Sequence, residues 1–212
     1  MHRKNIRILR LGLALLGLFA LWTWLVCHVD VRPAGETGTA VGFAGWNTRF
    51  HQFTGVHMAI YTATDALGLV PVLVCLVFAA LGLGQLIRRR SLWKADRDLL
   101  LLGGYYILVV GCYLAFEMYP INYRPILIEG RMEASYPSST TLLVLSVMPT
   151  LVVQARKRWP ALRWLPPLAT VFSLAMVAAR LLCGVHWLTD IVGGILLSGG
   201  LACLYRAGTQ EQ

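Results

Sequence analysis

The sequence contains few charged residues. Only 14% of its 212 residues are Asp, Glu, Lys or Arg, whereas 57% are hydrophobic, and the mean hydropathy is +0.63. A water-soluble domain carries about a quarter charged residues, so this composition excludes an ordinary soluble globule. A membrane-spanning helix takes roughly 20 mostly apolar residues, which leaves room for about five or six such helices and no second large unit. We therefore expect a single integral membrane domain over residues 1–212.

Three other signals are missing. The five cysteines form no C-x-x-C pair, which excludes the usual spacing of metal and redox sites. The net charge of +9 does not indicate nucleic acid binding, because the basic residues fall in short clusters between apolar runs rather than on one solvated face. The first apolar run follows a basic N-terminus but precedes no small-x-small cleavage pattern. We expect this run to be a membrane anchor and not a removed signal peptide.

Apolar runs predict an all-α, polytopic membrane protein with a bundle of six transmembrane helices. The runs are Ile6–Val26, Ala66–Ile87, Leu99–Phe116, Ser139–Ala155, Trp164–Leu182 and Thr189–Tyr205. With the N-terminus placed in the cytoplasm, 14 of the 19 basic residues fall in inner segments. The positive-inside rule thus predicts a cell-membrane protein with both termini cytoplasmic. In the long outer segment after the first span, aromatic residues near helical spacing fit either an interfacial helix over Val41–Val56 or a plain loop.

Polar and ionisable residues gather at the predicted outer ends of the last four spans. Ionisable groups at membrane depth are energetically costly and usually point into a bundle interior, so each is a functional candidate. The candidates are Glu117, Tyr123 and Arg124 after the third span, Ser138, Ser139 and Thr140 opening the fourth, and Arg180, His186 and Asp190 around the fifth and sixth. The opening of the fourth span also follows a proline and presents hydroxyls and amides at the positive end of a helix dipole, which suits an anion.

The chemistry of these side chains points to phosphate. Two guanidiniums, Arg124 and Arg180, can clamp a phosphate through paired N–H donors in a planar geometry that lysine lacks. His186 and Asp190 are four residues apart, which on a helix places them on one face. Asp190 can then accept a hydrogen bond from one ring nitrogen of His186 and leave the other nitrogen to attack phosphorus.

Three short motifs stand in order within Glu117–Asp190. They are Tyr123-Arg124-Pro125, Pro137-Ser138 and Arg180-x5-His186-x3-Asp190. Together they resemble the three signatures of the type-2 phosphatidic acid phosphatase superfamily, which also includes the vanadium haloperoxidases. The resemblance implies the helical-bundle core of that family and a phosphohistidine intermediate on His186 oriented by Asp190. It also implies phosphoryl binding by the two arginines and the Ser138 region, with no metal or other cofactor.

Two departures from the family pattern bear on activity. Thr140 stands where the second signature has a histidine, the family's general acid for the leaving alcohol, and Ser139 stands where it has glycine. Loss of a general acid lowers the rate by about 10²–10⁴ when the leaving group needs a proton. We therefore expect a preference for a lipid with a good leaving group, such as a polyprenyl diphosphate, over phosphatidate. The second departure is Glu117, which occupies the position of the first signature's lysine.

Two roles for Glu117 remain open from the sequence. It can pair with Arg124, Arg131 or Arg180 and order the clamp, or it can meet a cationic headgroup on the substrate. The predicted function is hydrolysis of a phosphorylated or diphosphorylated membrane lipid at the extracytoplasmic face. The alternatives are a lipid phosphotransferase and a catalytically silent protein that binds or transports phosphorylated lipids.

Overall fold

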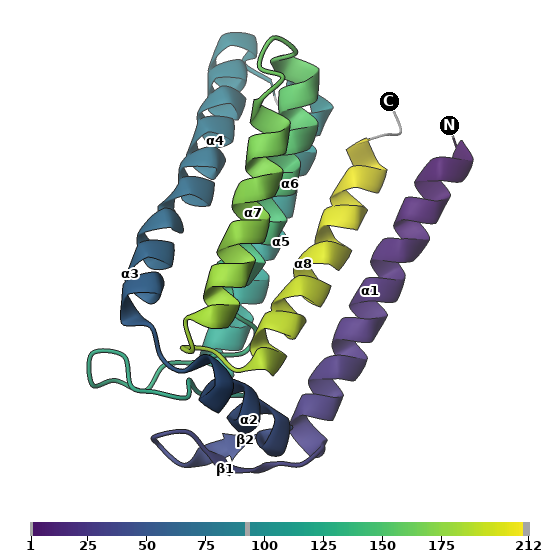
Figure 1. Cartoon of the computed structure of the whole chain (residues 1–212). Helices are drawn as coiled ribbons and strands as arrows, with labels where there is room; N and C mark the ends of the chain where they lie inside the picture. Colours follow the sequence, from purple (N-terminus) through teal and green to yellow (C-terminus); the bar gives the residue numbers. More distant parts are fainter. Residues whose placement is uncertain (1, 92–93, 210–212) are drawn as a thin grey trace.

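The computed structural model describes residues 2–91 and 94–209, and it is built mainly of helices (Figure 1). In chain order the elements are α1 (His2–His28), β1 (Arg32–Ala34), β2 (Thr39–Val41), α2 (Ala44–Thr54), α3 (Met58–Leu67), α4 (Leu69–Arg89), α5 (Arg97–Met118), α6 (Ser139–Arg158), α7 (Leu165–Leu182) and α8 (Leu188–Thr209). Six segments of the described chain are long and apolar enough to cross a membrane. Five of them contain a predicted run in full, and the remaining one, Leu165–Leu182, begins one residue after its predicted start. The expected all-α bundle of six membrane helices is confirmed.

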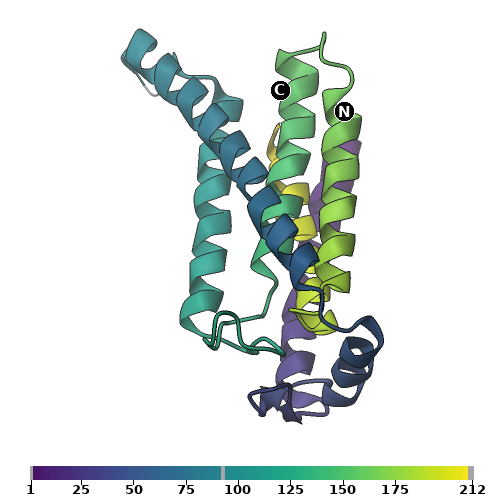
Figure 2. The same ribbon diagram turned by 60° about the vertical axis from the view of Figure 1, so that its left-hand side comes forward.

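The second span begins earlier than its apolar run predicted. It runs over Met58–Arg89, because α3 continues almost directly into α4 through Gly68, which itself has helical backbone angles. The polar residues Thr64 and Asp65 interrupt the apolar pattern of α3 and hid this extension. In Figure 2, α3 and α4 form one long tilted rod.

Both termini lie at one end of the bundle, and the hairpin β1–β2, α2 and the long loop after α5 lie at the other (Figure 1). The first and last helices, α1 and α8, run side by side. Glycine permits this approach, since a Cβ on Gly12 would stand 3.1 Å from the carbonyl oxygen of Gly200 and 3.0 Å from Cys203 Cβ. Small residues at such a seam are typical of packed membrane helices, because association there depends on close van der Waals contact.

The central element of the bundle is α6. It contacts α4, α5, α7 and α8, and its buried residues include Leu142, Val144, Val147 and Met148. A helix with partners on several sides is buried around most of its circumference, so its N-terminus is held in a defined place inside the other helices. The orientation of any site at the start of α6 is therefore set by the whole bundle.

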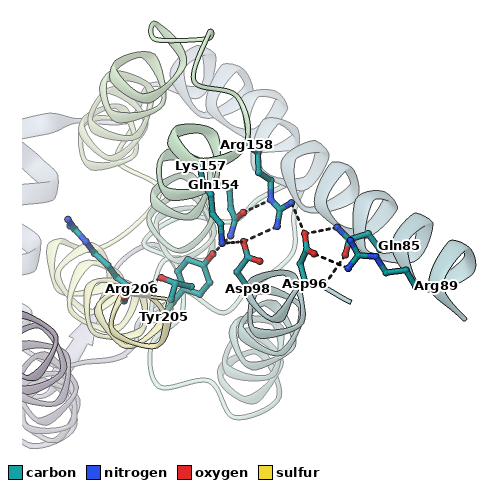
Figure 3. A network of polar contacts seen from close by, with 10 residues as sticks. Gln85, Arg89, Asp96, Asp98, Gln154, Lys157, Arg158, Tyr205 and Arg206 are labelled. Atoms are coloured by element: carbon teal, nitrogen blue, oxygen red, sulfur yellow. Dashed lines mark hydrogen bonds and ion pairs between the residues drawn. The ribbon is translucent and has the colours of Figure 1, made fainter. Parts of the chain in front are cut away.

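A network of ion pairs closes the end of the bundle that carries the termini (Figure 3). Arg158 at the end of α6 contacts Asp96 at 3.2 Å and Asp98 at 2.8 Å, and its Nε donates to Gln154. Asp96 also accepts from Gln85 on α4, and this bond, followed by the contact with Arg158, holds the pKa of Asp96 below its usual value. The network joins α4, α5 and α6 and so stabilises the end opposite the candidate site.

The segment after the first span contains a real helix, α2, so the helical alternative for Val41–Val56 is confirmed. Asn47 on α2 is buried and bonds to Thr189 at the start of α8, donating from Nδ2 at 3.0 Å and accepting the Thr189 amide at 3.3 Å. An orphan amide at the helix start is thereby satisfied by a side chain from a distant segment. The start of α8 is thus fixed from outside as well as from within the bundle.

Candidate functional site

The predicted site residues come together at the end of the bundle opposite the termini. The last residues of α5 and α7 and the first residues of α6 and α8 meet there, and α3 lies beside α7. The start of α6 is defined by Ser138, whose backbone is non-helical and whose hydroxyl accepts from the Thr141 amide. This is the usual geometry of a serine N-cap.

His186 lies in the turn before α8, which begins at Leu188, and not on the helix as its spacing from Asp190 predicted. The turn needs Gly184, whose φ is +71° and whose Cβ would collide with the backbone of Gly55. His186 Nδ1 is 3.9 Å from Asp190 Oδ2, too far for a hydrogen bond. The two residues face each other, but the direct bond expected between them is absent.

Ser135 connects the two groups instead. Its Oγ is 3.1 Å from His186 Nδ1 and also bonds to Asp190 Oδ2. Serine has one hydroxyl proton and an ionised carboxylate only accepts, so Ser135 donates to Asp190 and accepts from an Nδ1–H of His186. A neutral imidazole has one ring proton, and when that proton is on Nδ1, Nε2 of His186 has none. Ser135 is 2% exposed, and the three residues that form this chain of bonds are all buried.

Asp190 is completely buried and has three hydrogen-bond donors. Asn122 Nδ2 donates to Oδ1 at 3.1 Å, and the Trp187 amide and Ser135 both donate to Oδ2, the amide at 2.9 Å. These donors fix the position of the buried carboxylate and satisfy its oxygens. Asp190 can therefore stabilise positive charge on His186 through Ser135.

The His186 imidazole is held neutral. Burial lowers the pKa of His186 to about 4, and the positive charges of Arg124 and Arg180 act in the same direction, while Asp190 opposes them. Both guanidiniums are thus close enough to His186 to act on its charge. A neutral imidazole with a bare nitrogen is the form that can attack an electrophile.

The two arginines contact the same aromatic ring. The guanidinium carbons of Arg180 and Arg124 are 4.9 Å and 5.5 Å from the ring centre of Tyr61 on α3. Such cation–π contacts hold guanidiniums in a fixed orientation. Arg180 also contacts Asp65, one helical turn after Tyr61, at 3.3 Å, and Arg124 contacts Glu133 at 3.0 Å.

Buried nitrogens without partners mark the site. Nε and Nη1 of both Arg124 and Arg180 and Nε2 of His186 are buried and make no hydrogen bond. Buried polar atoms are nearly always paired, so a cluster of unpaired ones needs an explanation. Four cationic donors and one bare imidazole nitrogen form a complementary set for an anion that accepts hydrogen bonds and has an electrophilic centre.

The three hydroxyls of the second motif have different surroundings. Ser138 is buried, and its amide donates to the Asp190 carbonyl at 3.1 Å, which leaves that amide unable to bind an anion in this arrangement. The Thr140 hydroxyl accepts from Arg180 Nη2 at 2.5 Å and so orients the guanidinium. Ser139, at the first helical position of α6, lines a cavity. Ser139 and Thr140 occupy the first two positions of α6, where backbone amides have no partner within the helix.

A cavity of about 260 Å³ adjoins the cluster, which is close to the lower end of the range for small-molecule pockets (~300–1,000 Å³). Glu117, Arg124 and Glu133 line it together with Ser135 and Ser139. Glu117 pairs with none of the three arginines suggested from the sequence. Arg124 pairs with Glu133, and Arg180 pairs with Asp65.

Two further residues from the first motif region lie outside the cavity lining. Tyr123 contributes its backbone carbonyl, which accepts from Trp187 Nε1 at 2.8 Å. Arg131 lies in an exposed turn paired with Ile128. The backbone contact of Tyr123 therefore orders the loop beside His186, and Arg131 does not replace the missing lysine.

Sequence analysis missed four residues that contact the predicted ones: Tyr61, Asp65, Glu133 and Ser135. Tyr61 and Asp65 stand four apart on a helix and share one face, a signal hidden because α3 was assigned to the outer segment. Ser135 directly precedes the second motif, but nothing in its spacing indicates a bond to residues 51 and 55 positions later. Only the folded chain brings them together.

The chain was compared with known proteins. The sequence pattern of the PAP2 superfamily, the type-2 phosphatidic acid phosphatases, matches residues 77–212. No curated protein matches the chain. Among solved structures, a transmembrane PAP2-type phosphatidylglycerolphosphate phosphatase from Bacillus subtilis matches with a TM-score of 0.63 and 17% identity, over 94% of this chain and 96% of that one. At this identity the structural match concerns the fold alone.

Proposed function

Because the chain belongs to the PAP2 superfamily, we propose that it is a membrane lipid phosphatase which transfers a phosphoryl group to His186 and then to water. The observation that carries this proposal is the cluster of unpaired buried nitrogens on Arg124, Arg180 and His186. A phosphoryl group satisfies all of them at once, since its oxygens accept from guanidiniums and its phosphorus accepts a nucleophile.

In the first step, His186 Nε2 forms a bond to phosphorus while the bond from phosphorus to the leaving oxygen breaks. In a diphosphate the attacked atom is the terminal phosphorus, the leaving oxygen is the bridging one, and the lipid departs as its monophosphate. The imidazole becomes positively charged, and its Nδ1–H bond to Ser135, backed by Asp190, stabilises that charge. Arg124 and Arg180 neutralise the phosphoryl oxygens as charge develops in the transition state. In the second step, water attacks the phosphohistidine and releases inorganic phosphate.

The leaving group must depart without a histidine acid. Thr140 occupies that position, and its hydroxyl is engaged with Arg180. A hydroxyl is no acid near neutral pH, so a lipid whose leaving group needs little protonation is favoured. A polyprenyl diphosphate meets this condition because phosphate is a weakly basic leaving group, whereas phosphatidate does not.

We place this site at the extracytoplasmic face of the cell membrane. In support, the clusters of basic residues lie at the end of the bundle that carries both termini, and the site lies at the opposite end. The positive-inside rule places the basic end in the cytoplasm. A second cavity of about 350 Å³, lined by residues of α3–α6, shares Tyr113, Ser139 and Leu142 with the first. Its apolar lining suits an acyl or prenyl chain that enters from the side.

Trapping of the phosphoenzyme tests the proposal. Purified protein in detergent is mixed with a phosphorus-labelled polyprenyl diphosphate, quenched and analysed for acid-labile, base-stable label. We expect label on the parent and none on His186→Ala, with phosphate release reduced at least 10³-fold. The matched control is His28→Ala, since His28 is exposed at the end of α1, away from the site, and its ring bonds to and stacks on Trp24. Turnover that survives His186→Ala contradicts the assignment.

A catalytically silent lipid-binding protein is the second candidate function, and the loss of the acid at Thr140 favours it. In that case the parent binds phosphorylated lipids in a manner that depends on Arg124 and Arg180, but it releases no phosphate from any of them. Binding without turnover across monophosphates and diphosphates would replace the phosphatase proposal.

A further inference from the structure

A third cavity lies between α6, α7 and α8, toward the end of the bundle that carries the termini. Its volume is about 450 Å³, within the range of small-molecule pockets (~300–1,000 Å³). Most of its lining is apolar and includes Met148 and Val152 of α6, Leu174 of α7 and Ala202 of α8. Leu174 is also 65% exposed, so the cavity opens on the outer surface of the bundle. In a membrane this surface faces lipid chains.

Two arginines line the same cavity, Arg156 in the last turn of α6 and Arg206 in the last turn of α8. Both are exposed, and among the residues that the structure describes neither side chain makes an ion pair or a hydrogen bond. The carboxylates at this end pair elsewhere, since Arg158 contacts both Asp96 and Asp98. In Figure 3, Arg206 extends away from that network. Two positive charges are thus left at the edge of the cavity without a counterion from the described chain.

The hydroxyl groups in the lining already have partners. Thr170 and Ser173 donate to carbonyls of their own helix, α7, at 3.0 Å and 2.7 Å. The Tyr205 hydroxyl is bonded to Gln154 at 2.8 Å. Below the arginines the cavity therefore suits an apolar chain, because its polar groups need no further partner. A ligand that fits the whole cavity is amphipathic, with a negative charge at one end.

The length of the cavity matches one leaflet of a bilayer. On α6 the lining extends from Leu145 to Arg156, which is about 16 Å at 1.5 Å per residue. Half of a hydrocarbon core of about 30 Å is about 15 Å. Arginines in the last turn of a membrane helix lie at the level of the headgroups. The cavity thus extends from the headgroups to about the middle of the membrane.

We propose that this cavity binds one anionic phospholipid of the cytoplasmic leaflet, with its phosphate between Arg156 and Arg206 and an acyl chain along α6. The inference is independent of the phosphatase function, and the leaflet follows from the topology proposed above. Guanidiniums bind phosphate through paired N–H donors, and basic pockets between membrane helices on the cytoplasmic side are typical sites for anionic headgroups. A zwitterionic lipid fits less well, because its cationic group meets two arginines.

Two other occupants make different predictions. If the apolar groove takes any lipid chain, binding is independent of headgroup charge and of the arginines. If a helix of a second copy of this chain covers the groove, the protein is a dimer that dissociates when the groove is filled. The preference for headgroup charge, measured together with the mass of the protein, separates the three cases.

The experiment measures lipid binding directly. Delipidated full-length protein in a neutral detergent is titrated with phosphatidylglycerol or phosphatidylcholine of identical acyl chains, and native mass spectrometry counts the bound lipids. We expect the parent to bind one phosphatidylglycerol about tenfold more tightly than phosphatidylcholine, which corresponds to about 1.4 kcal/mol. The bound lipid should also raise the melting temperature, because it binds only the folded chain. Neither readout needs turnover, so the result is independent of activity at His186.

Removal of the two arginines tests the headgroup. Arg156→Ala combined with Arg206→Ala should abolish the preference for phosphatidylglycerol. The matched control is Arg88→Ala combined with Arg163→Ala. It removes the same charge from exposed positions at the same end, in the last turn of α4 and in the turn before α7, but neither residue lines the cavity. This control should keep the preference of the parent.

A bulky side chain in the groove tests the acyl chain. Thr170→Trp fills the cavity, whereas Val171→Trp adds the same ring at a neighbouring position of α7 that is 62% exposed and does not line it. We expect Thr170→Trp to weaken the binding of both lipids and Val171→Trp to leave it unchanged. Melting curves without lipid show whether each variant is folded.

Three results would overturn the inference. Equal binding of the two lipids by the parent would show that charge does not select the occupant. A preference that survives the loss of Arg156 and Arg206 but disappears in Arg180→Lys would assign the anionic lipid to the candidate site. A dimer that dissociates only in Thr170→Trp would assign the groove to a second copy of the chain.

Discussion

Ser135→Ala is the sharpest test of how His186 is supported. The hydroxyl of Ser135 is the only group among the described residues that bonds to both the His186 ring and Asp190. When it is removed, Nδ1 and Oδ2 are 3.9 Å apart, and no direct hydrogen bond forms without a shift of the chain. Asp190 keeps its bonds to Asn122 and Trp187, so the carboxylate itself stays in place.

The expected size of the effect follows from the charge that His186 gains. A hydrogen bond to a charged group contributes about 1.5–3 kcal/mol. The bond between Nδ1–H and Ser135 acquires this character only when phosphorus bonds to Nε2, so its loss raises the barrier and not the binding energy. We expect kcat to fall about 10- to 100-fold, since each 1.36 kcal/mol is a factor of ten. KM should change little, because the arginines still hold the phosphate.

The assay measures phosphate release and phosphohistidine formation for the parent and the variant in the same detergent. Ser198→Ala is the control, since Ser198 is fully buried on α8 and bonds within its own helix to Gly194. Thermal melts show whether either variant has lost its fold. A folded Ser135→Ala protein with a kcat within twofold of the parent would refute the reasoning and return the orienting role to Asp190 alone.

Three further predictions concern other parts of the molecule. Arg180→Lys should lower kcat/KM by about 10- to 100-fold, because lysine lacks the planar pair of donors and cannot stack a guanidinium plane on Tyr61. Steady-state kinetics of phosphate release measures this change. The His186 ring should stay neutral as pH falls from 7 to about 5 and should protonate only near pH 4, since burial lowers its pKa, and nitrogen-15 NMR of labelled histidine should show that midpoint. A midpoint at or above 6.5 would contradict the buried, neutral imidazole. Asp98→Asn should destabilise the protein by about 1–3 kcal/mol through the loss of its 2.8 Å contact with Arg158, visible as a lower melting temperature with kcat unchanged.

The spans and the motif residues were predictable because their signals are local. A run of about 20 apolar residues forms a helix in a bilayer whatever surrounds it, since the backbone has no other way to satisfy its hydrogen bonds there. The gathering of Arg124, Arg180 and His186 also followed from the spans, because helix ends on one side of a membrane share a plane. The exception was the start of the second span, where Thr64 and Asp65 masked the helical extension.

The partners of the site residues could not be predicted in this way. The spacing of His186 and Asp190 suggested two residues on one helix in direct contact, but the helix begins only at Leu188. Arg124 and Arg180 were likewise suggested as partners of Glu117, but they pair with Glu133 and Asp65. Which donor reaches which acceptor depends on differences of about one ångström, and these are set by how helices pack rather than by spacing along the chain.

The amino-acid order alone determined that this chain enters a membrane, where it crosses, and which ionisable side chains lie at the far end, because hydrophobic length and charge act through short stretches. Only the folded bundle decided that Ser135 stands between His186 and Asp190, that Tyr61 lies against both guanidiniums, and that Glu117 lines a cavity without an ion pair to any other described residue. Those contacts join segments far apart in sequence, and their geometry arises from the packing of all the helices at once.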